Sequence, residues 1–427
     1  MRIEKLIIPF IFYVITTPFS LLAQQKLTMQ ECQQWAIEQS SASSQLENLE
    51  RLRQIKRQVI KSFIPEISLN ASASYQSHTL PTFQSENNPS FLDINNPINK
   101  DQYLISLDLI QKIWDGGISK SQQKYDDITS DIAVQNVHIT SYEFKEEIGK
   151  MFLTVLYLQE NIKVIESSIL TLKEDLKKLK ALFANGIILE SNVYILEAEI
   201  MRIEQELKQI EMQQQSIRSA LSEFTKKDLQ RAEFVLTVTE SIDTTLQSNR
   251  PEFTLFQLQQ SALECQKKVL IGQSMPKINV FASGGYGRPT YNLLSNDFDF
   301  MYIVGAQLHI PITSWGSAKN GKDYLEIQKN LIFSQADAYR QNLRVKMMEK
   351  LNEMESLKNL LSSDDKIIDK RSFIVSICKK QLEEGVITAN DYIKEINALN
   401  EVMLNKELHI IQLEQAKMIF NSLKGRL

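Results

Sequence analysis

Residues 102–120 read QYLISLDLIQKIWDGGISK, and residues 301–319 read MYIVGAQLHIPITSWGSAK. Each stretch alternates apolar and polar residues, reaches a Trp and a Gly, and then enters a long run without helix breakers. The block from 103 to 199 recurs from 302 to 398, so the chain carries one unit twice; such duplication decides the fold of a repeat protein. The matched residues are Tyr103 and Tyr302, Lys120 and Lys319, Tyr125 and Tyr324, and Gly186 and Gly385, with 199 positions between the members of each pair.

A second offset relates the segments that precede these blocks. Residues 65–69 (PEISL) are echoed by residues 276–280 (PKINV), and Tyr75 by Tyr286, each 211 positions apart. The two offsets differ by 12 residues, and this difference has to fall between the two alternating segments of a copy. A surface loop can absorb such a length change at little cost.

Four segments are predicted to be β-strands because their side chains alternate with period 2. They cover residues 66–76, 102–112, 277–287 and 301–311, each with one apolar face and one polar face. Ten-residue strands of this kind are typical of outer-membrane β-barrels, whereas strands of soluble proteins are usually about five or six residues long. The alternative is two surface hairpins packed on helices.

Long helices follow each strand pair. The first is predicted from just after Gly117 to about Asn185, which gives roughly 105 Å at 1.5 Å per residue. Gly186 ends it in a position suited to a left-handed cap, and a returning helix spans about 190–224. Spacings of 4 and 3 alternate strictly along the apolar positions, which indicates a coiled-coil seam. These positions are Phe144, Ile148, Met151, Val155, Leu158, Ile162, Ile165, Ile169, Leu172, Leu176, Leu179 and Phe183.

The remaining helices are predicted from local signals. Thr28 and Glu31 form a capping-box pattern at the start of a short helix, and a second helix covers about 42–63. Pro251 opens a helix that runs to about Gln273. In the second copy the long helix covers about 317–384, Gly385 turns the chain, and the last helix ends near Leu423.

The N-terminal residues 1–23 are predicted to be a secretory signal peptide, because a basic start precedes an apolar run that ends at Ala23. An uncleaved membrane anchor is the alternative. The rest divides into a first structural repeat, 24–240, and a second, 241–427.

Composition points away from several functional classes. The formal net charge is −4 and the sequence pI is about 5.8, so no basic surface for nucleic acid is indicated. Cys32, Cys265 and Cys378 lie far apart and are interpreted as buried hydrophobes. Gly284-Gly285-Tyr286-Gly287 lacks the Lys-Ser/Thr pair of a phosphate loop and is interpreted as a strand end. Asp364-Asp365 is interpreted as a charge run on a solvated helix face. We predict no catalytic residues, metal ligands or cofactor, and hence no enzyme.

The strand count predicts an oligomer. A bilayer-spanning barrel has to close, and closed barrels have at least eight strands. One chain supplies four, so two chains would give 8 and three would give 12. The long helices cannot fit within the membrane and would project from it, which predicts a pore continued by a helical tunnel.

The sequence resembles the TolC-type outer-membrane factor family over nearly the whole mature chain. The similar pieces, in order, are residues 27–32 (LTMQEC), 64–67 (IPEI), 114–117 (WDGG), 249–252 (NRPE) and Trp315-Gly316. The resemblance implies an α+β membrane protein: a homotrimer with a 12-stranded transmembrane β-barrel, four strands per protomer, and a periplasmic α-helical barrel of coiled-coil helices. It further implies an outer-membrane exit duct for efflux or type I secretion, with a periplasmic adaptor protein and an inner-membrane transporter as partners.

Family resemblance also implies functional positions at the two hairpin turns. Adaptor docking would use the tips, and acidic rings would narrow the tunnel below the second tip. Asp391 matches one of these acidic positions, and Lys394 departs from the next. Asp391 and Lys394 could form ion pairs within or between protomers that hold the pore shut; solvated surface charge is the alternative. The predicted docking residues are Gly186, Ile187, Ile188, Ser191, Gly385, Val386, Ile387 and Asn390.

The main alternative function is a soluble periplasmic coiled-coil adaptor or scaffold. Such a protein would share the helical hairpins but would not need four alternating ten-residue strands in two matched pairs.

Overall fold

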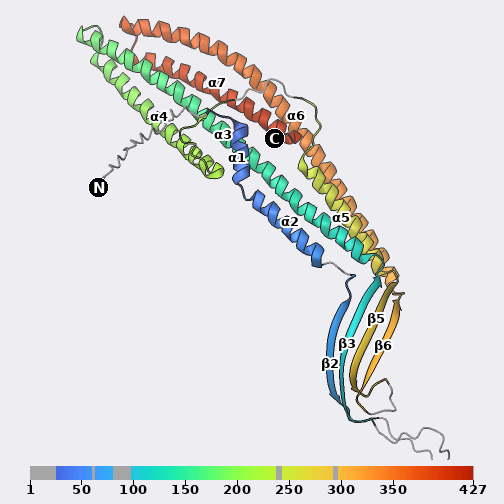
Figure 1. Ribbon diagram of the computed structural model, residues 1–427. Helices are drawn as coiled ribbons and strands as arrows, with labels where there is room; N and C mark the ends of the chain where they lie inside the picture. The colour runs from blue at the N-terminus through green and yellow to red at the C-terminus, as the bar shows by residue number, and fades with distance from the viewer. Residues whose placement is uncertain (1–25, 60–62, 80–97, 237–242, 292–296, 427) are drawn as a thin grey trace, which may run out of the picture. The chain divides into compact units, whose positions relative to one another are not determined.

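The computed structural model describes residues 26–59, 63–79, 98–236, 243–291 and 297–426. Within these ranges each copy runs through helix, two strands and two helices (Figure 1). The predicted signal peptide, 1–23, lies outside the described residues. The elements are β1 (Lys26–Leu27), α1 (Met29–Gln39), α2 (Ala42–Val59), β2 (Glu66–Tyr75), β3 (Asp101–Trp114), α3 (Ile118–Ala184), α4 (Glu190–Thr225), β4 (Glu233–Phe234), α5 (Pro251–Gln273), β5 (Lys277–Arg288), β6 (Asp299–His309), α6 (Ser314–Glu383) and α7 (Ala389–Lys424).

The chain folds into two compact units, and each unit draws on both sequence repeats. Unit 1 contains residues 1–40, 144–244 and 350–420, and unit 2 contains 41–143, 245–349 and 421–427. The duplication therefore does not produce one unit per copy. The repeat boundaries 24–240 and 241–427 remain a prediction about how the sequence was duplicated.

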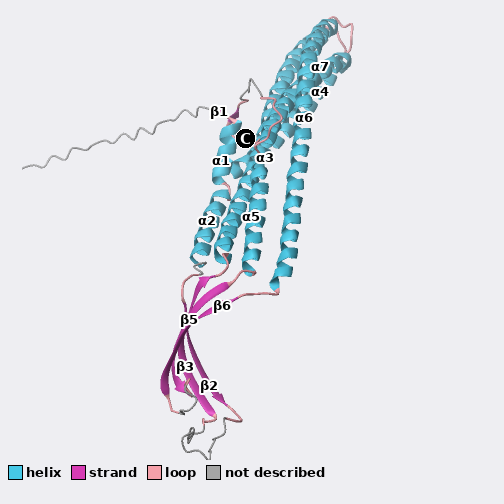
Figure 2. Cartoon of the chain, turned by 90° about the vertical axis from the view of Figure 1, so that its right-hand side faces the viewer, coloured by secondary structure: helices cyan, strands magenta, loops and turns pink. Residues whose placement is uncertain are grey.

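The sheet of unit 2, drawn in magenta in Figure 2, is antiparallel. Its strand order is β2-β3-β5-β6 (Figure 1), so the two copies meet at the β3–β5 pair. Within the first copy Glu66 lies opposite Ile110, and within the second Lys277 lies opposite His309. By the repeat offsets, Lys277 corresponds to Glu66, 211 positions earlier, and His309 corresponds to Ile110, 199 positions earlier. The two copies thus share one strand register, and the four predicted strands are confirmed with ends that shift by at most two residues.

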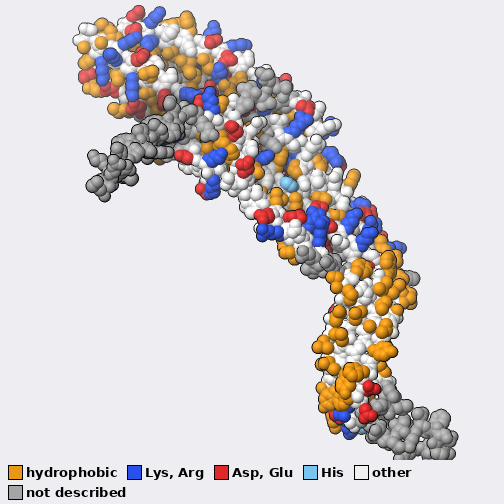
Figure 3. Space-filling view, in the orientation of Figure 1, with side chains coloured by type: hydrophobic (Ala, Val, Ile, Leu, Met, Phe, Trp, Pro, Cys, Tyr) orange, Lys and Arg blue, Asp and Glu red, His pale blue; other side chains and the backbone are white. Residues whose placement is uncertain are grey.

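One face of the sheet is apolar and exposed. Leu69, Leu107 and Tyr302 belong to this face and are 69%, 55% and 82% exposed. The register aligns the apolar sides of all four strands, and hydrophobic side chains cover the strands in Figure 3. The other face is polar: Asn70 and Ser106 both donate to the carboxylate of Asp108. A sheet with this division suits lipid on one side and water on the other.

Glycines let β3 and β5 approach closely. Gly285 and Gly287 lie inside β5, and a Cβ at either position would collide with a carbonyl oxygen of β3, from Ile105 or Tyr103. The interpretation of residues 284–287 as strand rather than phosphate loop is therefore confirmed.

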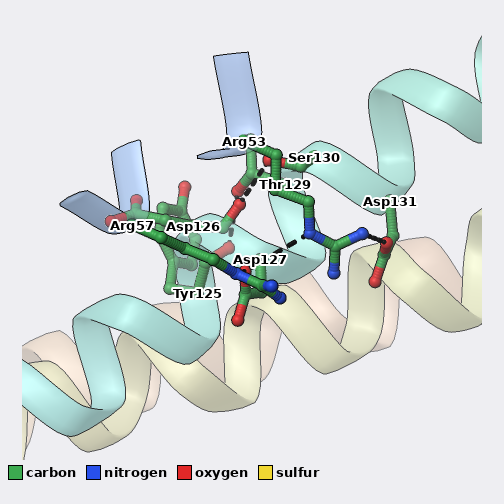
Figure 4. Close-up of polar contacts among 8 residues, drawn as sticks. All are labelled: Arg53, Arg57, Tyr125, Asp126, Asp127, Thr129, Ser130 and Asp131. Atoms are coloured by element: carbon green, nitrogen blue, oxygen red, sulfur yellow. Dashed lines mark hydrogen bonds and ion pairs between the residues drawn. The ribbon is translucent and has the colours of Figure 1, made fainter. Parts of the chain in front are cut away.

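Arginines on α2 fasten that helix to α3 in unit 2 (Figure 4). The guanidinium of Arg53 lies 2.9 Å from Asp131 and 3.4 Å from Asp127, and that of Arg57 lies 2.9 Å from Asp127. The hydrogen bond from Arg57 is the main reason why the pKa of Asp127 lies below its usual range. The stability that the ionised Asp127 carboxylate adds to the α2–α3 contact is present above the ordinary aspartate pKa. It is lost as the pH falls through the lowered pKa of Asp127.

Unit 1 is a helical core built from α3, α4, α6 and α7. The predicted seam is confirmed at positions such as Leu172 and Leu179, which are fully buried. The buried set draws on all four helices, so the two hairpins share one core. Its members are Ile165, Ile169, Leu172, Leu179, Ile188, Val193, Leu196, Ile200, Ile203, Leu382, Ala389, Tyr392, Ile393 and Ile396.

Local predictions in unit 1 are confirmed in part, and Cys378, which was interpreted as buried, is only partly buried against the helical core. Thr28 and Glu31 form the predicted capping box. Cys32 is fully buried, and burial raises the pKa of its thiol to about 12. The interpretation of Asp364 as a solvated charge was wrong: it is 6% exposed, and a carboxylate oxygen lies 2.6 Å from Nδ1 of His409. Periodicity could not show that a histidine 45 residues away would cover it.

Among the helices in the described ranges, none has both the length and the apolar composition needed to cross a membrane.

We expect Leu172→Ala to lower the free energy of unfolding by about 2–5 kcal/mol, because it removes a fully buried side chain and leaves a cavity. Leu170→Ala is the matched control, since Leu170 lies two positions before Leu172 on the same helix and is 62% exposed. Thermal or denaturant unfolding of the detergent-solubilised protein measures both. Equal losses for the two variants would contradict the assigned core.

Candidate functional site

Each helical hairpin of unit 1 ends in the same glycine turn. Gly186 and Gly385 have φ values of +74° and +75°, a conformation that costs an ordinary L-residue energy. After each glycine the chain closes the helix with paired hydrogen bonds: Ile187 N–H donates to the Leu182 carbonyl and Gly186 N–H to Phe183. Val386 and Gly385 repeat this pattern with Gln381 and Leu382. Both turns are therefore Schellman caps, which explains why glycine stands at these two positions.

The predicted docking residues divide into an exposed set and an anchoring set. Ile187 and Val386 are 52% and 67% exposed, so each turn presents one apolar side chain to solvent. Ile188 is buried in the hairpin core, and Ile387 packs against that core. Gly186, Gly385, Ser191 and Asn390 are exposed.

The two turns lie against each other. Ala389 N–H donates a 2.9 Å hydrogen bond to Oδ1 of Asn192, which joins the start of α7 to the start of α4. A Cβ at Gly385 would lie 3.4 Å from the Ile187 carbonyl oxygen. The predicted docking residues of the two copies thus form one surface, which we call the tip.

A buried polar cluster lies directly beneath the tip. The Tyr392 hydroxyl of α7 donates a 2.5 Å hydrogen bond to Oδ2 of Asp175 on α3, and Lys379 Nζ of α6 lies 2.6 Å from Oδ1 of Asp175. Asp175 is 4% exposed and Tyr392 is fully buried. Burial and the bond to Asp175 raise the pKa of Tyr392, so its hydroxyl stays protonated and remains a donor. Asp175 therefore connects both helices of the second hairpin to the first.

Asp391 has a local partner in this chain. Its carboxylate accepts hydrogen bonds from the backbone N–H and the hydroxyl of Thr388, at 3.1 Å and 2.6 Å. The Asp391 N–H donates back to the Thr388 hydroxyl at 3.3 Å, which completes a capping box at the start of α7. These bonds hold the pKa of Asp391 below its usual range. The capping bonds thus contribute their full stability above the ordinary aspartate pKa. This stability is lost as the pH falls through the lowered pKa of the folded protein.

Lys394 lies one turn further along α7 and is exposed. Within the described part of this single chain, its positive charge adds to the lowering of the Asp391 pKa, but no ion pair within 4 Å joins the two side chains. The ion pair within one protomer that the sequence suggested is thus not formed here, while a pair between protomers stays a prediction.

Sequence analysis missed Asp175, Tyr392 and Lys379. A signal existed, because Asp175 lies three residues after Leu172 and four before Leu179 and so falls on the buried stripe of α3. A polar residue at such a position needs a partner. The partners lie more than 200 residues away in the chain, where spacing along one helix cannot identify them.

The described ranges contain no group of three or more His, Cys, Asp or Glu side chains that could hold a metal ion.

No family model and no curated protein matches the sequence, but solved structures do. The Campylobacter jejuni outer-membrane channel CmeC superposes with a TM-score of 0.68 at 12% identity, over 93% of this chain and 85% of that one. The Vibrio cholerae outer-membrane protein VceC gives 0.68 at 16% identity, over 92% and 94%. The open state of the Neisseria gonorrhoeae outer-membrane channel MtrE gives 0.66 at 14% identity, over 93% and 89%.

This chain has the fold of the TolC-type outer-membrane channels. The coverage extends over both copies of the repeat, so the match is to the whole architecture and not to one hairpin. The predicted fold class, strands combined with very long helices in a duplicated chain, is confirmed. In this channel fold the tip and the Asp175 cluster form the end of the helical hairpins.

We expect Tyr392→Phe to destabilise the hairpin end by about 1–3 kcal/mol, because it leaves a buried carboxylate oxygen without its donor. Tyr194→Phe is the control: that hydroxyl donates to Glu190 at 3.2 Å from an exposed side chain, and its loss should cost less than about 0.5 kcal/mol. Hydrogen exchange of the amides around the tip reports the local opening. Unchanged exchange in Tyr392→Phe would show that Asp175 does not hold the hairpins together.

Proposed function

We propose that the protein is a passive outer-membrane channel, the exit duct of a tripartite efflux or type I secretion system. The observation that carries this proposal is the exposed, continuous apolar face on a four-stranded sheet whose other face is polar. Strands of 10 to 14 residues match the 9–11 residues that a tilted strand needs to cross a bilayer. The role is that of a duct and not of an enzyme.

A homotrimer accounts for the strand number. One chain provides four strands, and three chains provide the 12 that would enclose a water-filled channel. The polar face, with Asn70 and Asp108, would then line the lumen, and the apolar face would contact outer-membrane lipid. Helical parts would lie in the periplasm.

The tip is the surface we propose for a periplasmic adaptor protein, which would connect the duct to an inner-membrane transporter. Ile187 and Val386 support this role because they are apolar and exposed on turns that two glycine caps hold in place. Exposed apolar side chains on a rigid turn suit a small protein interface. Ser191 and Asn390 would form its polar rim.

We expect the mature protein to sediment with outer membranes, to require detergent for extraction, and to have about three times the protomer mass by light scattering with detergent subtracted. A water-soluble monomer or dimer would contradict the channel and would favour the coiled-coil adaptor or scaffold.

We further propose that Asp391 and Lys394 line the constriction of the pore, where they would pair between protomers. Asp391→Asn separates charge from capping, because an amide oxygen can still accept from Thr388. We expect Asp391→Asn and Lys394→Gln each to increase the single-channel conductance in planar bilayers. Asp391→Ala, which also loses the cap, controls for local unfolding. Wild-type conductance in both charge variants would eliminate the ion-pair hypothesis.

A further inference from the structure

Four helices meet the sheet of unit 2 at one of its ends. α2 and α5 end just before β2 and β5, and α3 and α6 begin just after β3 and β6 (Figure 1). Because neighbouring strands are antiparallel, these four junctions lie at the same end of the sheet, which we call the helix end. The helix end is therefore one continuous boundary between strands and helices.

The apolar face of the sheet reaches this boundary without interruption. Within the described strands its one charged side chain is Arg288, which lies at the opposite end. Trp114 is 51% exposed at the helix end, and Tyr75 and Phe300 are exposed at the opposite end. Aromatic residues at both ends of an apolar band mark the two surfaces of the bilayer in outer-membrane barrels. In the proposed channel, the headgroups of the periplasmic leaflet would thus lie at the helix end.

Basic residues occur at the helix end at the same positions in both copies. Lys120 on α3 and Lys319 on α6 are 199 positions apart, and residues 56–57 (KR) on α2 and 267–268 (KK) on α5 are 211 positions apart. Both distances are the offsets of the repeat. All these residues lie within about two helical turns, or roughly 10 Å, of a helix terminus next to the sheet. In Figure 3, blue Lys and Arg side chains accordingly gather beside the orange strands.

Internal ion pairs account for one basic residue of each adjacent pair. The guanidinium of Arg57 lies 2.9 Å from Asp127 on α3, and Lys267 Nζ lies 2.8 Å from Glu326 on α6. Asp127 and Glu326 are themselves repeat equivalents, 199 positions apart. Each copy thus fastens its two helices together and leaves the other basic residue of the pair unused.

The lysines that remain form a set that we call the basic belt: Lys56, Lys120, Lys268 and Lys319. All four are exposed, and within the described ranges none forms an ion pair with a carboxylate. Two acidic residues, Asp126 and Asp323, lie within the first three turns of α3 and α6. Lys124 and Lys322 on the same turns match them in number, so the belt keeps its positive charge.

We propose that the basic belt binds the phosphate groups of anionic phospholipids in the membrane leaflet at the helix end. This inference rests on the proposed outer-membrane channel and adds the class of lipid that its wall binds. Lipid is the partner because the belt borders a continuous apolar face, on which acyl chains can lie while the phosphate reaches the lysines. Lysine suits this level, since its apolar stem packs on apolar surface and its ammonium group extends to the headgroups.

Quenching of tryptophan fluorescence by brominated lipids tests the belt in the full, membrane-inserted protein. Trp114 is the reporter because it is exposed at the helix end, and Trp35 and Trp315 are replaced by Phe. Phosphatidylcholine proteoliposomes receive increasing fractions of brominated phosphatidylglycerol or, in a parallel series, of brominated phosphatidylcholine. We expect phosphatidylglycerol to be enriched at least about threefold around Trp114 at low salt, and this enrichment to disappear in 1 M NaCl because salt screens exposed charges.

The variant Lys56→Gln/Lys120→Gln/Lys268→Gln/Lys319→Gln should quench equally with both lipids, whereas replacing the same four lysines by Arg should preserve the enrichment. The matched control removes the same charge from four exposed lysines of unit 1, through Lys177→Gln, Lys358→Gln, Lys366→Gln and Lys370→Gln, and should also preserve it. If the belt variant does not insert, Lys120→Gln/Lys319→Gln takes its place and should lower the enrichment about twofold.

Equal quenching by the two lipids in the unsubstituted belt at low salt would overturn the proposal. So would an enrichment that survives in the inserted belt variants or falls equally in the unit 1 control. Failure of the proposed function is distinct, because protein that is soluble without detergent would be quenched by neither lipid.

Discussion

Backbone N–H and C=O groups along the outer strands of a sheet need partners before that sheet can lie in lipid, because the hydrocarbon offers them none. β2 and β6 carry such rows of groups, and their apolar sides face outward with those of β3 and β5. The same sheet is thus suited to lipid by its side chains and incomplete in its backbone. In the proposed channel, a single chain would therefore form only part of the barrel wall, and further copies would complete it.

In the helical unit, the contacts that matter most hold the two long hairpins together at the end where they turn. Its apolar seam forms the buried core, but a regular seam of Leu and Ile permits several helix registers. Asp175 restricts that choice, because its carboxylate needs both Tyr392 and Lys379 and those residues lie on different helices. The Asn192–Ala389 bond adds a second specific contact next to the turns. The glycine caps then fix the direction in which Ile187 and Val386 point into solvent.

Duplication explains why these arrangements repeat. The offsets of 199 and 211 positions recover both the Schellman caps at Gly186 and Gly385 and the shared register of β2–β3 and β5–β6. At the two hairpin turns the copies share the backbone hydrogen bonds of the glycine cap and differ in their side chains. Asp391 caps α7 through Thr388, whereas the equivalent α4 begins at Leu189 without a side-chain cap. One of the two turns of the tip thus has a side-chain capping box that the other lacks.

The sequence by itself determined the strands, the long helices, their glycine turns and the repeat, because each leaves a periodic or local pattern: period 2 in Ile67 to Tyr75, alternating 4 and 3 from Phe144 to Phe183, and glycine where φ is positive. Only the tertiary structure decided that Asp175 meets Tyr392 and Lys379 and that Asp364 is covered by His409, whereas the capping of α7 by Asp391 through Thr388 follows a local pattern that the sequence analysis did not identify. The first two contacts join residues distant in the chain. Periodicity records which face of a helix is buried, but the partner on that face depends on how separate helices pack.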